Sequence, residues 1–246
     1  MAVILFCAAH PDDETLGMGV AIAEHVAAGH DVNVLVMSRS VGSAVKDFLN
    51  GVSTSGWWGV PHDPAAEGYT PLTSGEFGQA RIDECRRALD TLATGLGTIT
   101  LHESGLTGGF TSTDAQNAIV AVSDVINPGG PVRLKGHTWV TQLDAHAEHI
   151  AVGSAMKALK AANPTRFGDV RYYILPQYWN DPDLNLVTES IDWPTDAGIS
   201  ARALNACRVY GAWAPPHSYA IGHHSVFSTM FAPLMTGSGP RCMFHT

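Results

Sequence analysis

The chain has 246 residues, of which 45% are hydrophobic and 15% are charged, and this balance is typical of a globular protein rather than a disordered or fibrous one. Its 14 basic residues against 23 acidic ones give a formal net charge of −9, and no run of basic side chains is present. Because such a run is what neutralises a row of phosphates, we expect no nucleic-acid partner.

Neither a disulfide framework nor a membrane anchor is indicated by the sequence. The four cysteines are widely separated and form no Cys-x-x-Cys pair, which indicates reduced thiols in a cytoplasmic protein. The apolar run at residues 2–9 has no basic segment before it, and His10 ends it long before it could span a bilayer. We therefore expect a cytoplasmic protein without a membrane span. Its 12 histidines prompt a search for metal ligands.

Strands and helices are predicted to alternate through the first 175 residues. Apolar or β-branched runs indicate strands at residues 3–9, 32–37, 98–102, 138–141 and 170–175. Apolar residues at helical spacing indicate helices at residues 14–28, 75–94, 115–126 and 147–162. This order predicts a Rossmann-like α/β fold, with a mostly parallel sheet and helices on both faces. We expect residues 1–246 to form a single domain.

Two segments depart from this alternation. Residues 39–74 are rich in Gly, Ser, Thr and Pro, and we expect a long excursion from the sheet, of the kind that is functional or disordered. Its tryptophans, Trp57 and Trp58, either stack on a sugar or an aromatic group or pin the loop to the core. From residue 176 onward the pattern is irregular, apart from one short helix predicted at residues 199–210.

The first polar motif, His10-Pro11-Asp12-Asp13-Glu14, stands where the first strand ends and the first helix begins. Ligands bind at the carboxyl ends of the strands in an open α/β sheet. A dinucleotide site would place a glycine-rich turn here, whereas one imidazole and three carboxylates favour a cation. His10 and Asp13 are close enough in a tight turn to bind the same ion. The alternative is a polar turn that caps a helix.

The second motif, Asp144-Ala145-His146-Ala147-Glu148-His149, follows another predicted strand and opens another helix. His146 and His149 can share a helix face, so that both ligate a metal, or one ligates while the other faces a substrate. An ordinary polar first turn is again the alternative. Because both motifs follow strands of one sheet, we expect them to meet at its carboxyl edge.

Three segments resemble the LmbE/PIG-L family of zinc-dependent N-acetylglucosaminyl deacetylases. The first motif, preceded by Ala8-Ala9 and followed by Leu16-Gly17, resembles the family signature, and the segment His146–His149 resembles its second motif. Residues 219–226 resemble the C-terminal segment of the family. The insertion at residues 49–64 is most similar to the branch that deacetylates the glucosaminyl group of teicoplanin-type lipoglycopeptide antibiotics.

The resemblance implies a role for five residues. His10, Asp13 and His149 are the expected ligands of Zn²⁺, Asp12 is the expected general base, and His146 is the expected second catalytic group. Three ligands leave a fourth zinc position open, as in catalytic sites, where bound water has a pKa of about 7. Asp12 would take the proton of that water and His146 would stabilise the oxyanion, while either could protonate the leaving amine.

The implied function is zinc-dependent hydrolysis of the acetamide of an N-acetylglucosaminyl group on a teicoplanin-type glycopeptide intermediate, which releases acetate and a free amino sugar. One alternative is deacetylation of a smaller inositol-linked or thiol-linked N-acetylglucosamine conjugate. Another is a metal-dependent sugar-binding protein without turnover. In each case the partner is a small glycoconjugate, and the sequence leaves the oligomeric state open.

Other polar residues are expected outside the site. The family has Asp before its last histidine ligand, and because Glu148 is one methylene longer, we leave it out. His62 is predicted to lie in a surface turn. His223 and His224 are adjacent, so in an extended segment at most one of them faces the site.

Overall fold

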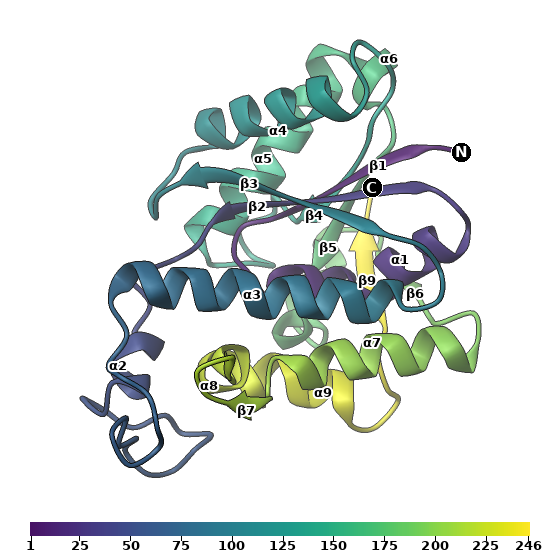
Figure 1. The fold of residues 1–246 in the computed structure, drawn as a ribbon. Helices are drawn as coiled ribbons and strands as arrows, with labels where there is room; N and C mark the ends of the chain where they lie inside the picture. Colours follow the sequence, from purple (N-terminus) through teal and green to yellow (C-terminus); the bar gives the residue numbers. More distant parts are fainter.

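The computed structural model describes residues 1–246, and its centre is a seven-stranded sheet with the strand order β3-β2-β1-β4-β5-β9-β6 (Figure 1). Strands β1 to β5 pair in parallel, and β9 pairs antiparallel with both β5 and β6. The Rossmann-like, mostly parallel α/β sheet predicted from the sequence is therefore confirmed. The strands are β1 (Val3–Ala8), β2 (Asp31–Ser38), β3 (Ile99–Leu106), β4 (Arg133–His137), β5 (Val170–Ile174), β6 (Ser190–Asp192) and β9 (Cys242–His245).

Helices cover both faces of this sheet because alternate strand residues point to opposite faces. Ile4 and Phe6 of β1 belong to a cluster of 36 buried residues with α1 (Asp13–Ala27), α3 (Ser74–Ala93) and α7 (Ala197–Val209). Leu5 and Cys7 belong to a cluster of 18 buried residues with α4 (Ser112–Ile126) and α5 (Ala147–Ala162). No helix combines the length and the apolar character that a membrane span requires.

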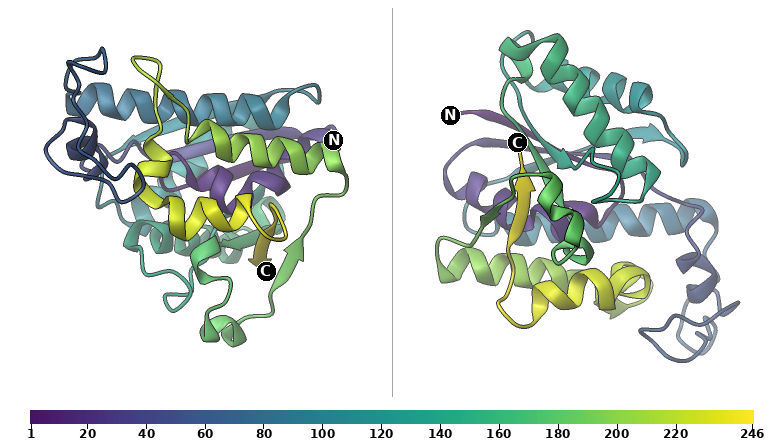
Figure 2. Two further views of the ribbon diagram at one scale, coloured as in Figure 1. Left: turned by 90° about the horizontal axis from the view of Figure 1, so that it is seen from below. Right: turned by 180° about the vertical axis from the view of Figure 1, so that it is seen from behind.

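The remaining elements are short and lie mostly in the excursion and the C-terminal third of the chain. They are α2 (Val45–Leu49), α6 (Pro164–Phe167), η1 (Pro176–Tyr178), η2 (Pro182–Leu186), the two-stranded sheet of β7 (Trp213–Ala214) and β8 (Ser218–Tyr219), α8 (Ile221–Val226), η3 (Phe227–Phe231) and α9 (Ala232–Met235). The predicted helix at residues 199–210 corresponds to α7. In the rear view of Figure 2, the yellow strand β9 runs beside the green strand β5.

The predicted strand at residues 138–141 is wrong, because the strand is β4 at residues 133–137. The sequence Arg-Leu-Lys-Gly-His has no apolar run, yet Lys135 is buried in the strand with its Nζ 2.7 Å from Oδ1 of Asp169. This ion pair satisfies the buried ammonium group, so a polar residue occupies a core position. Strand β9 was not predicted either, because it pairs only with strands distant in sequence.

The topology determines where a ligand can bind. The order of the first five strands reverses between β1 and β4, which are neighbours in the sheet. In doubly wound sheets the crevice at this reversal, outside the carboxyl ends of the strands, is the binding position. The His10 motif follows β1, and the His146 motif follows β4 by a short loop.

Candidate metal centre

A strained turn connects β1 to α1 and carries the first motif. Asp12, the N-cap of α1, has φ +128°, a backbone conformation that side chains other than glycine rarely adopt. The fully buried carboxylate of Glu14 holds this turn, since its Oε2 accepts from the backbone N–H of Asp12 at 2.9 Å. Its Oε1 accepts from the hydroxyls of Thr15 and Tyr210, at 2.8 and 2.6 Å. Asp12 and Asp13 are therefore presented on a fixed backbone.

The second motif is fixed by Asp144, which is buried just before α5. Its Oδ1 accepts from the backbone N–H of His146 at 2.9 Å, and its Oδ2 lies 2.8 Å from Nδ1 of His149. His146 is the N-cap of α5, and its Nδ1 accepts from the backbone N–H of Glu148 at 3.3 Å. Both histidines are thus oriented by hydrogen bonds within the turn.

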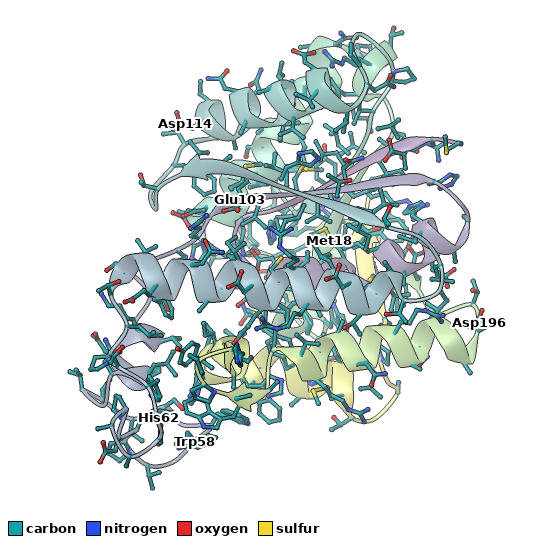
Figure 3. The ribbon with its side chains drawn as sticks, in the orientation of Figure 1. Met18, Trp58, His62, Glu103, Asp114 and Asp196 are labelled. Carbon is teal, nitrogen blue, oxygen red and sulfur yellow. The ribbon has the colours of Figure 1, made fainter.

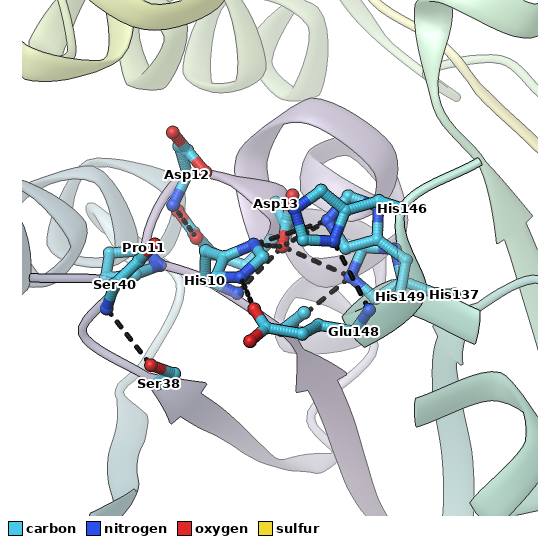
Figure 4. Close-up of polar contacts among 12 residues, drawn as sticks. His10, Pro11, Asp12, Asp13, Ser38, Ser40, His137, His146, Glu148 and His149 are labelled. Carbon is cyan, nitrogen blue, oxygen red and sulfur yellow. Dashed lines mark hydrogen bonds and ion pairs between the residues drawn. The ribbon is translucent and has the colours of Figure 1, made fainter. Parts of the chain in front are cut away.

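The three residues expected to bind zinc are brought together (Figure 4). The Nδ1 of His10 lies 3.4 Å from Oδ2 of Asp13, Nε2 of His149 lies 3.4 Å from the same oxygen, and the two nitrogens are 3.3 Å apart. Donors about 2.0–2.1 Å from a tetrahedral zinc ion are about 3.3–3.4 Å from one another. The triangle of donor atoms therefore has the size of one face of a zinc tetrahedron.

Carboxylates behind the two imidazoles determine which ring nitrogen faces this triangle with a lone pair. Glu148 accepts from Nε2–H of His10, and Asp144 accepts from Nδ1–H of His149. In the neutral imidazoles the inward nitrogens then carry no hydrogen. Oδ2 of Asp13, which accepts from the backbone N–H of His10 at 2.8 Å, is the third acceptor of the triangle, and only a cation or added protons can satisfy the two inward nitrogens. The donor set fits a divalent metal ion.

The pKa shifts of the three donor residues also favour a bound cation. Burial opposes protonation of His149, but Asp13 and Asp144 outweigh it and raise its pKa to about 10. Burial likewise opposes a charge on His10, yet hydrogen bonds to Asp13 and Glu148 raise its pKa. Burial would raise the pKa of Asp13, but His149 and His137 hold it well below its usual range. The site favours positive charge, and a metal ion would displace protons from it.

Asp12 lies outside the triangle and beside a buried arginine. The guanidinium Nη2 of Arg81 lies 2.9 Å from the backbone oxygen of Pro11 and 3.3 Å from Oδ2 of Asp12. Burial raises the pKa of the Asp12 carboxyl to about 7, although Arg81 acts to lower it. Asp12 is thus a carboxylate with no metal-ligating contact, held next to the donor triangle.

His146 stacks on the ring of His149, with centroids 4.4 Å apart and planes at 24°. Because its Nδ1 accepts the Glu148 amide, the neutral ring carries its hydrogen on Nε2. Burial and the neighbouring His149 and His10 lower its pKa. The side chain is therefore a neutral N–H donor at neutral pH.

Three residues near the triangle were missed or left out by sequence reasoning. Arg81 comes from α3, far along the chain, and nothing local marks it. Glu148, which we left out, contacts His10 and the backbone N–H of Gly109 and orients the first ligand. His137 ends β4, and its position on the carboxyl edge becomes visible only when that strand is placed at residues 133–137.

His137 contacts the metal centre without completing it. Its Nε2 lies 3.2 Å from Oδ2 of Asp13, and the same atom accepts from the backbone N–H of Ala9 at 3.2 Å. Its ring is parallel to that of His149, at 6°, with centroids 4.1 Å apart. Because the Ala9 amide occupies its lone pair, His137 supports the two ligands rather than acting as a further one.

A cavity of about 270 Å³ opens onto the triangle. It is lined by all five residues expected in the site, together with Arg81, Ser40, Ser43, Leu16, Ser225, Val226 and Met230. A larger cavity of about 650 Å³, beside Tyr69 and Asp83, shares no lining residue with it. None of the convergent metal-ligating groups lines the larger cavity, so the chemistry belongs to the smaller one.

The other histidines singled out in the sequence gather elsewhere. His62 is buried, so its interpretation as a surface turn is wrong; its Nδ1 contacts Glu67 at 2.8 Å and its Nε2 contacts His224 at 3.3 Å. His223 and His224 lie on α8 rather than in an extended segment, and both contact Trp57. Neither contacts the donor triangle.

Comparisons with known proteins identify a family and a shared fold. The family model PIG-L, described as GlcNAc-PI de-N-acetylase, matches residues 5–160, whereas no curated protein sequence matches the chain. The fold is similar to that of the A40926 pseudoaglycone deacetylase Dbv21, with 18% identity, coverage of 99% of this chain and 96% of that one, and a TM-score of 0.64.

Two further solved structures share the fold. For a triple mutant of a deacetylase of the teicoplanin biosynthetic pathway, identity is 15%, coverage is 99% and 97%, and the TM-score is 0.62. For the N,N'-diacetylchitobiose deacetylase of Pyrococcus horikoshii, identity is 14%, coverage is 84% and 68%, and the TM-score is 0.54. With the family model covering well over half of its residues, this chain belongs to the PIG-L family.

Proposed function

We propose that this protein is a zinc-dependent deacetylase that hydrolyses the acetamide of an N-acetylglucosaminyl group and releases acetate and a free amine. The observation that carries the proposal is the triangle of His10 Nδ1, Asp13 Oδ2 and His149 Nε2, with every side at 3.3–3.4 Å. Membership of the PIG-L family supports the reaction class. We treat residues 1–246 as one catalytic domain.

Zn²⁺ is the proposed metal because two imidazole nitrogens and one carboxylate oxygen are typical of catalytic zinc sites. His10, Asp13 and His149 would hold it, while Glu148 and Asp144 fix the orientation of the two imidazoles. When bound, the ion supplies a bound water with a pKa of about 7 and polarises a carbonyl group.

Asp12 is the proposed general base. Its carboxylate lines the cavity of the triangle, and its pKa of about 7 is suited to accepting a proton from an attacking water at neutral pH. A strained, buried carboxylate is costly to maintain, which supports a role in turnover rather than in binding alone. Arg81 would keep the carboxylate in place beside the substrate carbonyl.

His146 is the proposed donor to the developing oxyanion, since its neutral ring carries Nε2–H and lines the cavity of the donor triangle. The neutral state of His146 also indicates which residue protonates the leaving amine. A neutral His146 would have to give up its only N–H proton, whereas Asp12 holds the proton it has just accepted. We therefore propose that Asp12 returns this proton to the departing nitrogen.

The proposed substrate is an N-acetylglucosaminyl group on a teicoplanin-type glycopeptide intermediate. Two of the solved structures with this fold are deacetylases of A40926 pseudoaglycone and of the teicoplanin pathway. The excursion at residues 39–74 also supports a large substrate, because it contributes Ser40 and Ser43 to the cavity wall and Trp57 to an adjoining one. A small inositol-linked or thiol-linked conjugate would need no such extension.

The test is incubation of the zinc-loaded protein with an N-acetylglucosaminyl pseudoaglycone and, separately, with N-acetylglucosaminyl inositol. We expect the pseudoaglycone to lose about 42 Da, the mass change of amide hydrolysis that removes one acetyl group, and a chelator to abolish the loss. Loss from the inositol conjugate alone would replace the substrate proposal. Binding of either compound without any mass loss would indicate a sugar-binding protein and contradict the proposal.

A further inference from the structure

A second cavity adjoins the metal centre. Its volume is about 420 Å³, and Ser225 lines both this cavity and the one that opens onto the donor triangle. Residues 225–228, at the junction of α8 and η3, therefore form the wall between the two. The second cavity is lined by Gly56, Trp57, His223, His224, Ser225, Phe227 and Ser228.

Four of the seven residues that line this second cavity carry aromatic rings. The indole of Trp57 stands nearly perpendicular to the imidazoles of His223 and His224, at centroid distances of 5.2 and 5.0 Å. It lies 6.1 Å from the ring of Phe227, which in turn contacts His223 at 4.8 Å. Trp57 is half-buried, so part of its surface faces the cavity. Edge and face contacts of this kind suit a further ring.

The residues on either side of Trp57 hold it in place. Ser55 is buried, and its Oγ accepts from the backbone N–H of Trp58 at 3.1 Å and lies 2.7 Å from Nδ1 of His224. The ring of His62 is stacked on Trp58 at 4.8 Å and on Trp213 at 4.4 Å. Figure 3 shows Trp58 and His62 together in the excursion.

The hydrogen bonds that link Ser55, His224, His62 and Glu67 all run in one direction, from Ser55 to Glu67. Glu67 can only accept, so Nδ1 of His62 donates to it and Nε2 of His62 carries a lone pair. Nε2–H of His224 then donates to His62, and Nδ1 of His224 accepts from the hydroxyl of Ser55. Every group of the series has its partner, so the wall is formed before any ligand arrives.

The cavity wall carries no net charge at neutral pH. No lysine, arginine, aspartate or glutamate lines it. Burial lowers the pKa of His223 to about 4 and that of His224 to about 3, so both rings are neutral. An uncharged aromatic group is therefore a better match than an ion, and the donor triangle next to it remains the charged part of the site.

We propose that the second cavity is a specificity subsite that binds an uncharged aromatic ring attached to the N-acetylated sugar, with Trp57 and Phe227 as its contact surfaces. The inference rests on the proposed function, because it places the sugar in the cavity of the donor triangle. Trp58, by contrast, contributes to the support and not to the contact surface. The two neighbouring tryptophans thus have different roles.

The experiment compares deacetylation of 2-naphthyl and methyl N-acetylglucosaminides by the zinc-loaded protein. We expect kcat/KM to be about tenfold higher for the naphthyl glycoside, as one well-placed ring contact provides. In Trp57→Ala the ratio should fall close to one, and in Trp57→Phe it should remain largely intact. Trp193→Ala is the matched control, because Trp193 is 49% exposed and lines neither cavity.

The outcomes separate the two proposals. Equal kcat/KM for the two glycosides, or an unchanged ratio in Trp57→Ala, would overturn the subsite and leave deacetylation intact. If neither glycoside nor the pseudoaglycone loses its acetyl group, the proposed function fails. Calorimetric binding of the naphthyl glycoside to wild type and to Trp57→Phe then still decides the subsite: tight binding to both, lost in Trp57→Ala, supports it, and absence of binding refutes it.

Discussion

Two groups of histidines in this chain have opposite hydrogen-bonding patterns. In the metal-centre group, the inward nitrogens of His10 and His149 are both acceptors when the imidazoles are neutral, and they lie beside a carboxylate oxygen of Asp13. In the excursion group, the nitrogens of His62 and His224 are also 3.3 Å apart, but one donates and the other accepts. The first arrangement requires a cation, whereas the second is already satisfied.

The carboxylates around the rings cause this difference. Asp13 and Asp144 overcome burial and raise the pKa of His149 to about 10, and Glu148 acts in the same direction on His10, whereas burial lowers the pKa of His224 to about 3. Equal nitrogen–nitrogen distances therefore do not identify a metal site. The protonation pattern imposed by the outer partners does, and the following predictions test it.

The largest expected effect is on zinc binding, when one imidazole is removed from the His10–His149 pair and, for comparison, one from the His62–His224 pair. His149→Asn should weaken zinc binding by more than about a hundredfold and abolish deacetylation, since even the outer partner of a ligand contributes about 10- to 100-fold. His62→Asn should keep full zinc binding. Zinc content after dialysis against a competing chelator measures both. Loss of zinc in the His62 variant would remove the distinction between the two groups.

The next largest effect is a fall in kcat with no change in zinc content. Asp12→Asn removes the proposed base but leaves the three donor atoms in place, so kcat should fall by about 10²- to 10⁴-fold while zinc content stays at one ion per chain. Steady-state kinetics and metal analysis on the same preparation provide the measurement. An unchanged kcat would refute the assignment of the base.

A smaller effect is expected from the outer carboxylates. Glu148→Gln weakens the hold on His10 and should lower zinc affinity by about 10- to 100-fold. Glu67→Gln changes the corresponding partner of His62 and should leave zinc affinity unaltered. Competition titrations with a zinc-sensitive chelator compare the two variants. Equal zinc affinities would contradict the role given to Glu148.

The smallest effect is on acid stability. His224 has an unfolded pKa near 6.5 and a folded pKa of about 3, so the unfolded chain binds more protons as the pH falls below 6.5, and the folded state loses stability. His224→Gln removes this contribution. The deficit in the free energy of unfolding of the variant at pH 7.5 should therefore shrink at pH 5, as measured by urea denaturation. A deficit that grows would contradict a buried, neutral His224.

Much of this molecule could be predicted from local patterns. Continuous apolar runs gave β1 and β2, and the two polar motifs at strand ends were brought together because adjacent parallel strands share a carboxyl edge. The approach of His10, Asp13 and His149 follows from that rule. Their outer partner Asp144 belongs to the same motif as His149, so it too lay within the segment already singled out.

What could not be predicted depends on contacts between distant residues. Strand β4 was misplaced because Lys135 is buried by pairing with Asp169, and His137 was missed with it. Arg81 reaches Asp12 across 69 positions, and His62 meets His224 across 162. No periodicity or local motif encodes such pairs. Arg81 meets Asp12 only when α3 packs beside α1, and His62 meets His224 only when the excursion folds against α8.

The most direct test of the account is the position of zinc in a crystal of the protein, located by anomalous scattering. We predict one strong peak about 2.0–2.2 Å from Nδ1 of His10, an oxygen of Asp13 and Nε2 of His149. A zinc ion bound instead between His62 and His224, or a peak that omits His10, would contradict it.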